Sequence, residues 1–363
     1  MKLPTDLMKR TFKISHFCPA VVLPLVLLAA CLSMSTASST STAHASGVPG
    51  IASLNGYQIS LFASSTASYY QPASAAVDNG HVFIGYQNNT AADGSRPNTS
   101  TIVEYTMDGK VVKTFSVPGQ SESLDVDPTS HLLWIIANSA ANPELEIIDP
   151  TSGTASNYTF PKTPHGGGYE GLSFINGMAF ISASNPALNN SGVNVFPAVD
   201  KISLSSGQVM LTAVLPGNAQ AIDITSGDNN SLGSLNETDP EALSTDTKGD
   251  LVLLNQARAE AVFIAQPATA GQKVSRLSTG SELDQLVWAT SARGRFLVVD
   301  SARNASYWVQ ATFTPGTAYT ETASNAGVAG VFGTLNLSTG NVSPVAIGFS
   351  NPSGLLFIPG AQS

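Results

Sequence analysis

Residues 169–184 (YEGLSFINGMAFISAS) contain the pattern that decides the fold of this chain. A polar start leads into an apolar stretch, the chain turns at Gly177, and a second apolar stretch follows. Glycine at such a turn supplies the positive φ that a tight hairpin requires. The segment therefore predicts a pair of short antiparallel strands.

The same pattern recurs along the whole chain. We find six copies, at residues 72–86, 121–138, 169–184, 240–255, 283–300 and 352–360. Further hairpin turns separate them, at Gly109, Gly153, Gly207 and Gly340. Each unit is therefore predicted to contain about four short strands. Four-stranded units that recur at a spacing of forty-odd residues are typical of β-propeller blades. We predict an all-β chain, a six-bladed β-propeller of four-stranded antiparallel blades. A β-sandwich is the alternative, but it does not explain six matched segments.

The ends of the repeat array predict how the ring closes. The sixth copy stops after its first two strands, and residues 56–63 (GYQISLFA) precede the first copy. We expect these residues to supply the missing outer strand, so that N- and C-terminal strands share one blade and leave no exposed edge. Two long intervals are predicted insertions, at residues 218–239 and around residues 315–329. We expect the first insertion to cover one mouth of the ring as a lid.

Composition limits the classes of partner. The chain has 363 residues, of which 25 are acidic and 16 are Lys or Arg, giving a net charge of −9. Nucleic acid and anionic lipid both require clustered basic residues, so neither is expected as a partner. Both cysteines, Cys18 and Cys31, lie near the N-terminus, which excludes a disulfide scaffold, a Cys-zinc site and a Cys nucleophile in the predicted domain. We expect a monomer.

The first 45 residues have the features of an export signal. A positive segment from Lys2 to Lys13 precedes an apolar stretch, residues 17–31, that is too short to span a bilayer. Ala43-His44-Ala45 fits ordinary signal cleavage, whereas Leu28-Ala29-Ala30-Cys31 resembles a bacterial lipoprotein signal with a lipid anchor at Cys31. Both routes stay open. Residues 1–45 are thus predicted to be signal peptide and tether, and residues 46–363 a single propeller domain that is secreted, periplasmic or lipid-anchored, with a bacterial source favoured.

One column of the repeat is acidic. The first strand of each propeller blade lines the central channel, and the aligned position near one mouth is occupied by Ala73, Glu122, Glu170, Glu241, Asp284 and Ser353. The second strands end at the same mouth, at residues that include Asn138, Asn255 and Asp300, and His165 lies close to Glu170 in the sequence. Carboxylates gathered in one pocket repel each other, and a divalent cation relieves that repulsion. We expect calcium, with magnesium or manganese as alternatives. The alternative interpretation is that these acidic side chains are solvated and bind no ligand.

Three segments carry a resemblance to a known group of proteins. Tyr169-Glu170-Gly171-Leu172, the run from Asp239 to Leu243 (DPEAL) and residues 294–301 (GRFLVVDS) resemble the six-bladed propellers of the NHL-repeat and gluconolactonase/regucalcin-like superfamily. The resemblance covers most of residues 57–360. It implies a divalent metal held by Glu170, Asn255 and Asp300, which polarises an ester or lactone carbonyl or activates a water. It also implies that Glu241 and Asp284 act as further ligands or as the base. Ala73 departs from the EGP-type motif that those enzymes carry in their first blade.

Three functions are therefore compatible with the sequence. The first is an exported propeller that hydrolyses small esters or lactones with a divalent metal. The second is a non-catalytic propeller that binds a small molecule or a cell-surface ligand, such as a glycan, a peptide or a protein. The third is a structural surface protein. Fold alone does not decide between them.

Overall fold

The computed structural model describes residues 43–45, 47–95, 99–225, 227, 231–322 and 329–360. The described strands belong to one unit, Ser41–Ser363. Most of the predicted export signal, including the anchor motif at Cys31, lies outside the described residues. Within the described ranges no helix is long and apolar enough to cross a membrane.

The described secondary structure consists of strands, which confirms the all-β prediction. The strands form five hydrogen-bonded sheets, and nearly all neighbours are antiparallel. A first sheet contains β4 (Pro72–Asp78), β5 (His81–Tyr86), β6 (Thr99–Thr106) and β7 (Val111–Pro118). An eight-stranded sheet follows, in the order β12 (Leu172–Ile175), β13 (Met178–Ser182), β14 (Pro197–Ser205), β15 (Gln208–Pro216), β11 (Ala155–Thr159), β10 (Glu144–Ile148), β9 (Leu133–Ala137) and β8 (Ser121–Val126).

The remaining three sheets contain the second half of the chain and its beginning. One is ordered β17 (Leu232–Ser234), β16 (Gln220–Asp223), β21 (Lys273–Ser278), β20 (Glu260–Ala265), β19 (Leu251–Asn255) and β18 (Pro240–Thr245). Another is ordered β28 (Pro352–Pro359), β23 (Gly294–Asp300), β24 (Ala305–Gln310) and β3 (Gln58–Ser64). The last is ordered β1 (Ala43–Ala45), β2 (Ala52–Leu54), β27 (Val342–Phe349), β26 (Gly330–Leu335), β25 (Ala318–Thr322) and β22 (Gln285–Trp288).

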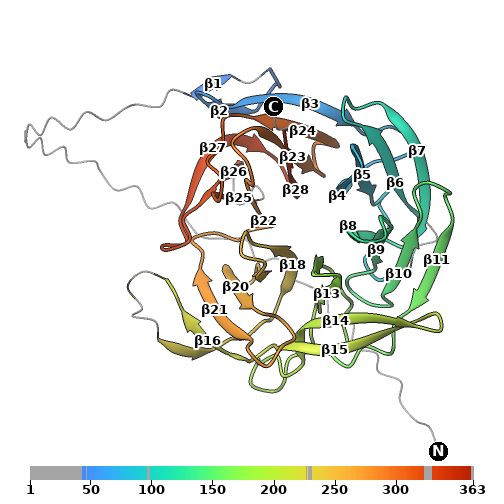
Figure 1. Ribbon diagram of the computed structural model, residues 1–363, viewed down its shortest axis with the longest axis vertical. Helices are drawn as coiled ribbons and strands as arrows, with labels where there is room; N and C mark the ends of the chain where they lie inside the picture. The colour runs from blue at the N-terminus through green and yellow to red at the C-terminus, as the bar shows by residue number, and fades with distance from the viewer. Residues whose placement is uncertain are drawn as a thin grey trace, which may run out of the picture. The chain divides into compact units, whose positions relative to one another are not determined.

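The sheets of this unit are arranged around a common axis (Figure 1). Six inner strands contact one another in the order β4, β8, β12, β18, β22 and β28, and β28 also contacts β4. The eight-stranded sheet supplies two of these inner strands, because ladder pairing joins its two halves only at the parallel pair Thr159–Gln208 of β11 and β15. Inner strands from distant parts of the sequence thus line one central space.

The hydrophobic core is divided among the interfaces between neighbouring four-stranded groups. Each of six clusters combines buried side chains of two such groups. The most aromatic one places Phe296 within 5.2 Å of Phe332 and 4.6 Å of Tyr319, measured between ring centroids. Full burial of one side chain of this size contributes about 1.5–3 kcal/mol. Packing between sheets therefore holds the ring together in the described residues.

The fifth sequence copy does not form the predicted strand pair. Its two strands, β22 and β23, lie in different sheets: β22 pairs with β25, whereas β23 pairs with β28 and β24. Tight turns with positive φ join the other paired copies, for example at Gly177 and Gly249, but residues 289–293 have no positive φ. Without a tight turn the second strand continues into the neighbouring sheet.

Two further predictions about strand order need correction. The sixth copy is one strand, β28, rather than two, and its partner β23 comes from the fifth copy. Residues 318–322 are not part of an insertion, because they form β25 and pair with β22. The segment inserted between β22 and β25 is instead the β23–β24 hairpin. Strand β3 pairs with β24, in the sheet that also contains β28.

The predicted lid over the channel mouth is also corrected. Within residues 218–239, β16 pairs with β21 and β17 pairs with β16, which places both at the outer edge of their sheet. The inner strand of the same sheet is β18, at the opposite edge (Figure 1). An ion pair between Arg276 and Asp223, 2.9 Å long, fastens β16 to β21. Strands β16 and β17 therefore widen the sheet at the edge opposite the inner strand β18.

Candidate axial binding site

The six column positions found in the sequence line one pocket on the axis. Its volume is about 300 Å³, and its walls include Ala73, Glu122, Glu170, Glu241, Asp284 and Ser353. Each residue lies on a different inner strand or within two residues of its start. The four carboxyl side chains are partly buried and open onto this pocket. The pocket walls contain no Lys, Arg or His among the described residues.

Close packing between two inner strands positions two of these carboxyl groups. The hydroxyl of Ser182 accepts a hydrogen bond from the Gly171 N–H at 2.7 Å and donates one to the backbone carbonyl of Glu241. A Cβ at Gly171 would lie 2.3 Å from that same carbonyl oxygen. Only glycine fits there, so Glu170 and Glu241 are held beside each other by the backbone.

Amide and hydroxyl side chains form hydrogen bonds to the other two carboxyl groups. Glu122 accepts hydrogen bonds from Gln87 Nε2 and Ser139 Oγ, both at 3.0 Å. Asp284 Oδ1 accepts a hydrogen bond from Gln256 Nε2 at 2.6 Å. Gln87 and Gln256 also line the pocket. Sequence reasoning missed both residues, although each directly follows a second strand of the repeat.

Burial and mutual repulsion raise the pKa values of these groups. Burial raises the pKa of Glu122 to about 7, against the lowering effect of its two hydrogen bonds. Burial, followed by the charges of Asp239, Asp284 and Glu122, raises the pKa of Glu241 to about 8. The pKa of Glu170 is raised well above its usual range by burial and then by Glu122 and Glu241. The pocket therefore retains protons near neutral pH that an incoming positive charge would displace.

Two of the three predicted metal ligands have other partners. Asn255 is 1% exposed and donates from Nδ2 to Glu237 Oε2 at 3.0 Å. Asp300 is fully buried and accepts hydrogen bonds from the backbone N–H groups of Arg303, Ser350 and Asn351 at 2.7–3.0 Å. Neither residue lines the pocket. Gln256 and Ser301, which directly follow β19 and β23, do line it.

The two other predicted pocket residues also have structural partners. The Asn138 side chain donates to the carbonyl of Asn142 at 3.0 Å and accepts from the Gln120 N–H at 2.9 Å. His165 is 1% exposed, and its Nε2 bonds the carbonyl of Gly168 at 2.8 Å. Burial lowers the pKa of His165, which favours a neutral ring. Both residues therefore shape loops behind the pocket instead of facing it.

The residues do not fit a metal ion held directly by the predicted ligands. Glu170 reaches the pocket, whereas Asn255 and Asp300 do not. Among the described residues, no group of three or more His, Cys, Asp or Glu side chains is placed to hold a metal ion. The carboxyl groups instead surround the pocket from separate strands, an arrangement suited to a larger or hydrated cation.

Comparisons with known proteins give no family assignment. No protein-family model matches the chain, and no curated protein matches its sequence. Similar solved structures include a virginiamycin B lyase from Staphylococcus aureus, with 11% identity over 70% of this chain and 99% of that chain, at a TM-score of 0.45. A putative gluconolactonase is 10% identical over 83% of this chain and 84% of that chain, at a TM-score of 0.44. A protein of unknown function from Bacteroides thetaiotaomicron is 12% identical over 82% of this chain and 70% of that chain, at a TM-score of 0.48. TM-scores below 0.5 do not establish a shared fold, so we base the proposed function on this chain's own strands and side chains.

Proposed function

We propose that the chain is a six-bladed β-propeller that binds a positively charged ligand in its axial pocket. Six inner strands in mutual contact, six clusters between four-stranded groups, and the sharing of one sheet by β3 and β28 support this blade count and closure. The N-terminal sequence pattern supports export, either as a secreted or as a lipid-anchored protein.

One observation carries the ligand class. Four carboxyl groups from four strands surround a pocket of about 300 Å³ whose described walls include no basic side chain. A cation entering this pocket replaces repulsion among carboxylates by attraction, and it displaces protons from Glu122 and Glu241. An organic ammonium group suits carboxyl groups on separate strands, since its N–H groups donate to several acceptors and it does not need ligands gathered around one point. A divalent ion with its water shell is the other cation to test.

Thermal melting tests the proposal directly. We expect methylammonium chloride to raise the melting temperature, because a ligand that binds only the folded state stabilises it by about 2.7 kcal/mol at a hundredfold excess over Kd. Calcium, magnesium and manganese chlorides are tested alongside, and sodium chloride at equal ionic strength controls for screening. The effect is reduced in Glu241→Gln and retained in Glu144→Gln, a change on β10 outside the pocket. No shift with any cation would contradict the proposal.

Acid–base hydrolysis of a small ester or lactone is a second candidate. The observation that favours it is the pKa of Glu241, about 8, beside Asp284, because a carboxyl group protonated near neutral pH can act as a general acid. This activity would depend on Glu241 and fall as the pH rises past its pKa. Lactone and ester hydrolysis by the wild type and Glu241→Gln across a pH series tests it, and absence of turnover removes the candidate.

A further inference from the structure

A second pocket lies next to the acidic one along the axis. Its volume is about 390 Å³, and the two pockets share six wall residues: Ala73, Glu122, Ser123, Gly171, Gln285 and Ser353. Because the shared residues belong to inner strands on several sides of the ring, the pockets lie end to end. Together they offer more length than a small cation fills.

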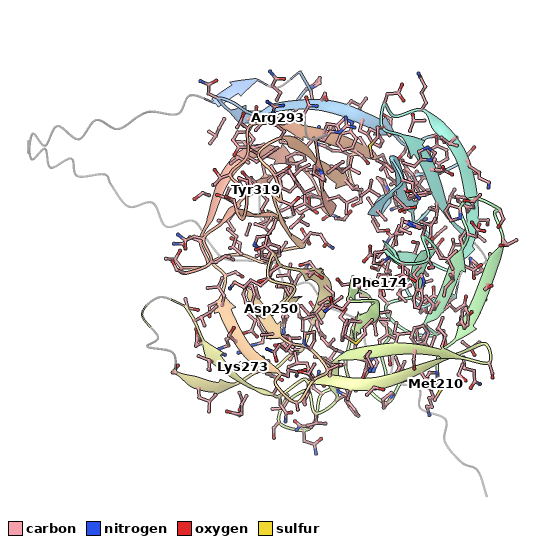
Figure 2. The ribbon with its side chains drawn as sticks, viewed as in Figure 1. Phe174, Met210, Asp250, Lys273, Arg293 and Tyr319 are labelled. Carbon is pink, nitrogen blue, oxygen red and sulfur yellow. The ribbon has the colours of Figure 1, made fainter. Side chains whose placement is uncertain are left out.

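The second pocket differs from the first in its chemistry. Phe174, Val287 and Leu356 line it from three different inner strands and are partly buried. Val287 and Leu356 pack partly against the core clusters between sheets, and their partly exposed side chains form part of the wall of the second pocket. Figure 2 shows Phe174 near the centre of the ring, far inside Met210 on the outer strand β15.

Charge in the second pocket is limited to one further carboxyl group. Asp125 joins Glu122 in its walls, and burial raises the pKa of Asp125 to about 7. The described walls of this pocket, like those of the first, contain no Lys, Arg or His. An anionic ligand therefore finds no partner along the axis, whereas an uncharged apolar group finds a surface at one end only.

We propose that the ligand is an amphipathic cation, with an ammonium group in the acidic pocket and an apolar substituent that extends between Phe174, Val287 and Leu356. This inference rests on the proposed function, because it takes cation binding as given and adds the apolar end. The acidic end selects the sign of the charge. The apolar end selects ligands with a hydrocarbon tail, since each buried methylene adds to the affinity.

Calorimetric titration with a ligand series tests the proposal. We compare methylammonium, hexylammonium and hexanoate on the full chain. Burial of one methylene strengthens binding about fourfold, so that three buried methylenes of hexylammonium give about sixtyfold over methylammonium. We expect this gain for hexylammonium and no detectable binding of hexanoate.

Two substitutions at the apolar end locate the tail. Val287→Ser and Leu356→Ser, on different inner strands, are expected to weaken hexylammonium binding severalfold and to leave methylammonium binding unchanged. Using both keeps the test valid if one variant fails to fold. Glu144→Gln again serves as the control.

The outcomes separate this inference from the proposed function. Equal binding of methylammonium and hexylammonium overturns the amphipathic ligand and leaves cation binding intact. No binding of either ammonium ion overturns the amphipathic ligand, and if calcium, magnesium and manganese also fail to bind, the cation-binding proposal itself is overturned. Hexanoate binding as tight as that of hexylammonium contradicts both, because it shows that charge plays no part.

Discussion

Individual residues fix the geometry of the axial pocket through backbone contacts. Gly171 lets β12 and β18 approach so closely that Ser182 bridges the backbones on either side. Glu170 precedes this contact and Glu241 lies across it, so the distance between two of the four carboxyl groups is set by a residue without a side chain.

Gly171→Ala is expected to destabilise the protein. The new Cβ would lie 2.3 Å from the Glu241 carbonyl oxygen and 2.6 Å from the Leu243 nitrogen, and backbone atoms cannot move aside cheaply. Overpacking of this kind costs about 1–3 kcal/mol of unfolding free energy. Urea unfolding measures the loss. Gly280→Ala is the matched control, because its Cβ would meet its nearest neighbour at 3.6 Å. Equal stability of the two variants would show that β12 and β18 are not so closely packed.

Residue patterns in the sequence predicted the acidic column but not its partners. All six column positions line one pocket, because a repeated strand places equivalent residues at equivalent heights. The expected ligands Asn255 and Asp300 miss the pocket by one position, because each is the last residue of its strand and is hydrogen-bonded to buried protein groups. Gln256 and Ser301 occupy the facing positions. Strand ends are too poorly defined in a sequence to settle that single step.

At the level of elements, the C-terminal half of the ring interleaves two sheets. The chain leaves β22, builds the β23–β24 hairpin of the neighbouring sheet, and returns for β25. Local apolar patterning predicted most of these strands, because it depends only on nearby residues. It could not predict that β23 pairs with β28 and β24, since that choice depends on residues distant in sequence and on the absence of a tight turn after β22.

Asp300→Ala tests the structural role of the end of β23. Asp300 accepts three backbone hydrogen bonds that link the turn after β23 to the connection between β27 and β28. Leaving such donors unpaired costs about 1–3 kcal/mol each, so we expect a loss of several kcal/mol in chemical unfolding. Binding of methylammonium by the folded fraction should be unchanged. A selective loss of calcium binding with little change in stability would instead restore Asp300 as a metal ligand.

For the whole molecule, buried carboxyl groups determine how stability depends on pH. Glu122, Glu237 and Glu241 have pKa values of about 7, 8 and 8, each raised first of all by burial. In the unfolded chain the pKa of a Glu side chain is about 4.3. The folded state therefore binds more protons than the unfolded state between these limits.

Stability is consequently expected to fall as the pH rises from about 5 to about 8, by on the order of 1 kcal/mol per pH unit for each such group. The lowered pKa of His165 acts in the opposite direction, but it is a single group, whereas burial also raises the pKa values of Asp125 and Glu170. Urea midpoints across this pH range measure the effect. A higher midpoint at the alkaline end would contradict the assigned burial of these carboxyl groups.

The measurement that tests the central claim most directly is titration calorimetry with methylammonium at about pH 7, in two buffers with different ionisation enthalpies. The difference between the buffers counts the protons released on binding. Because Glu122 and Glu241 hold protons near this pH, we predict saturable binding with net proton release, and a smaller release in Glu241→Gln. Absence of binding, or binding that releases no protons and ignores this substitution, would show that the axial carboxyl groups do not form a cation site.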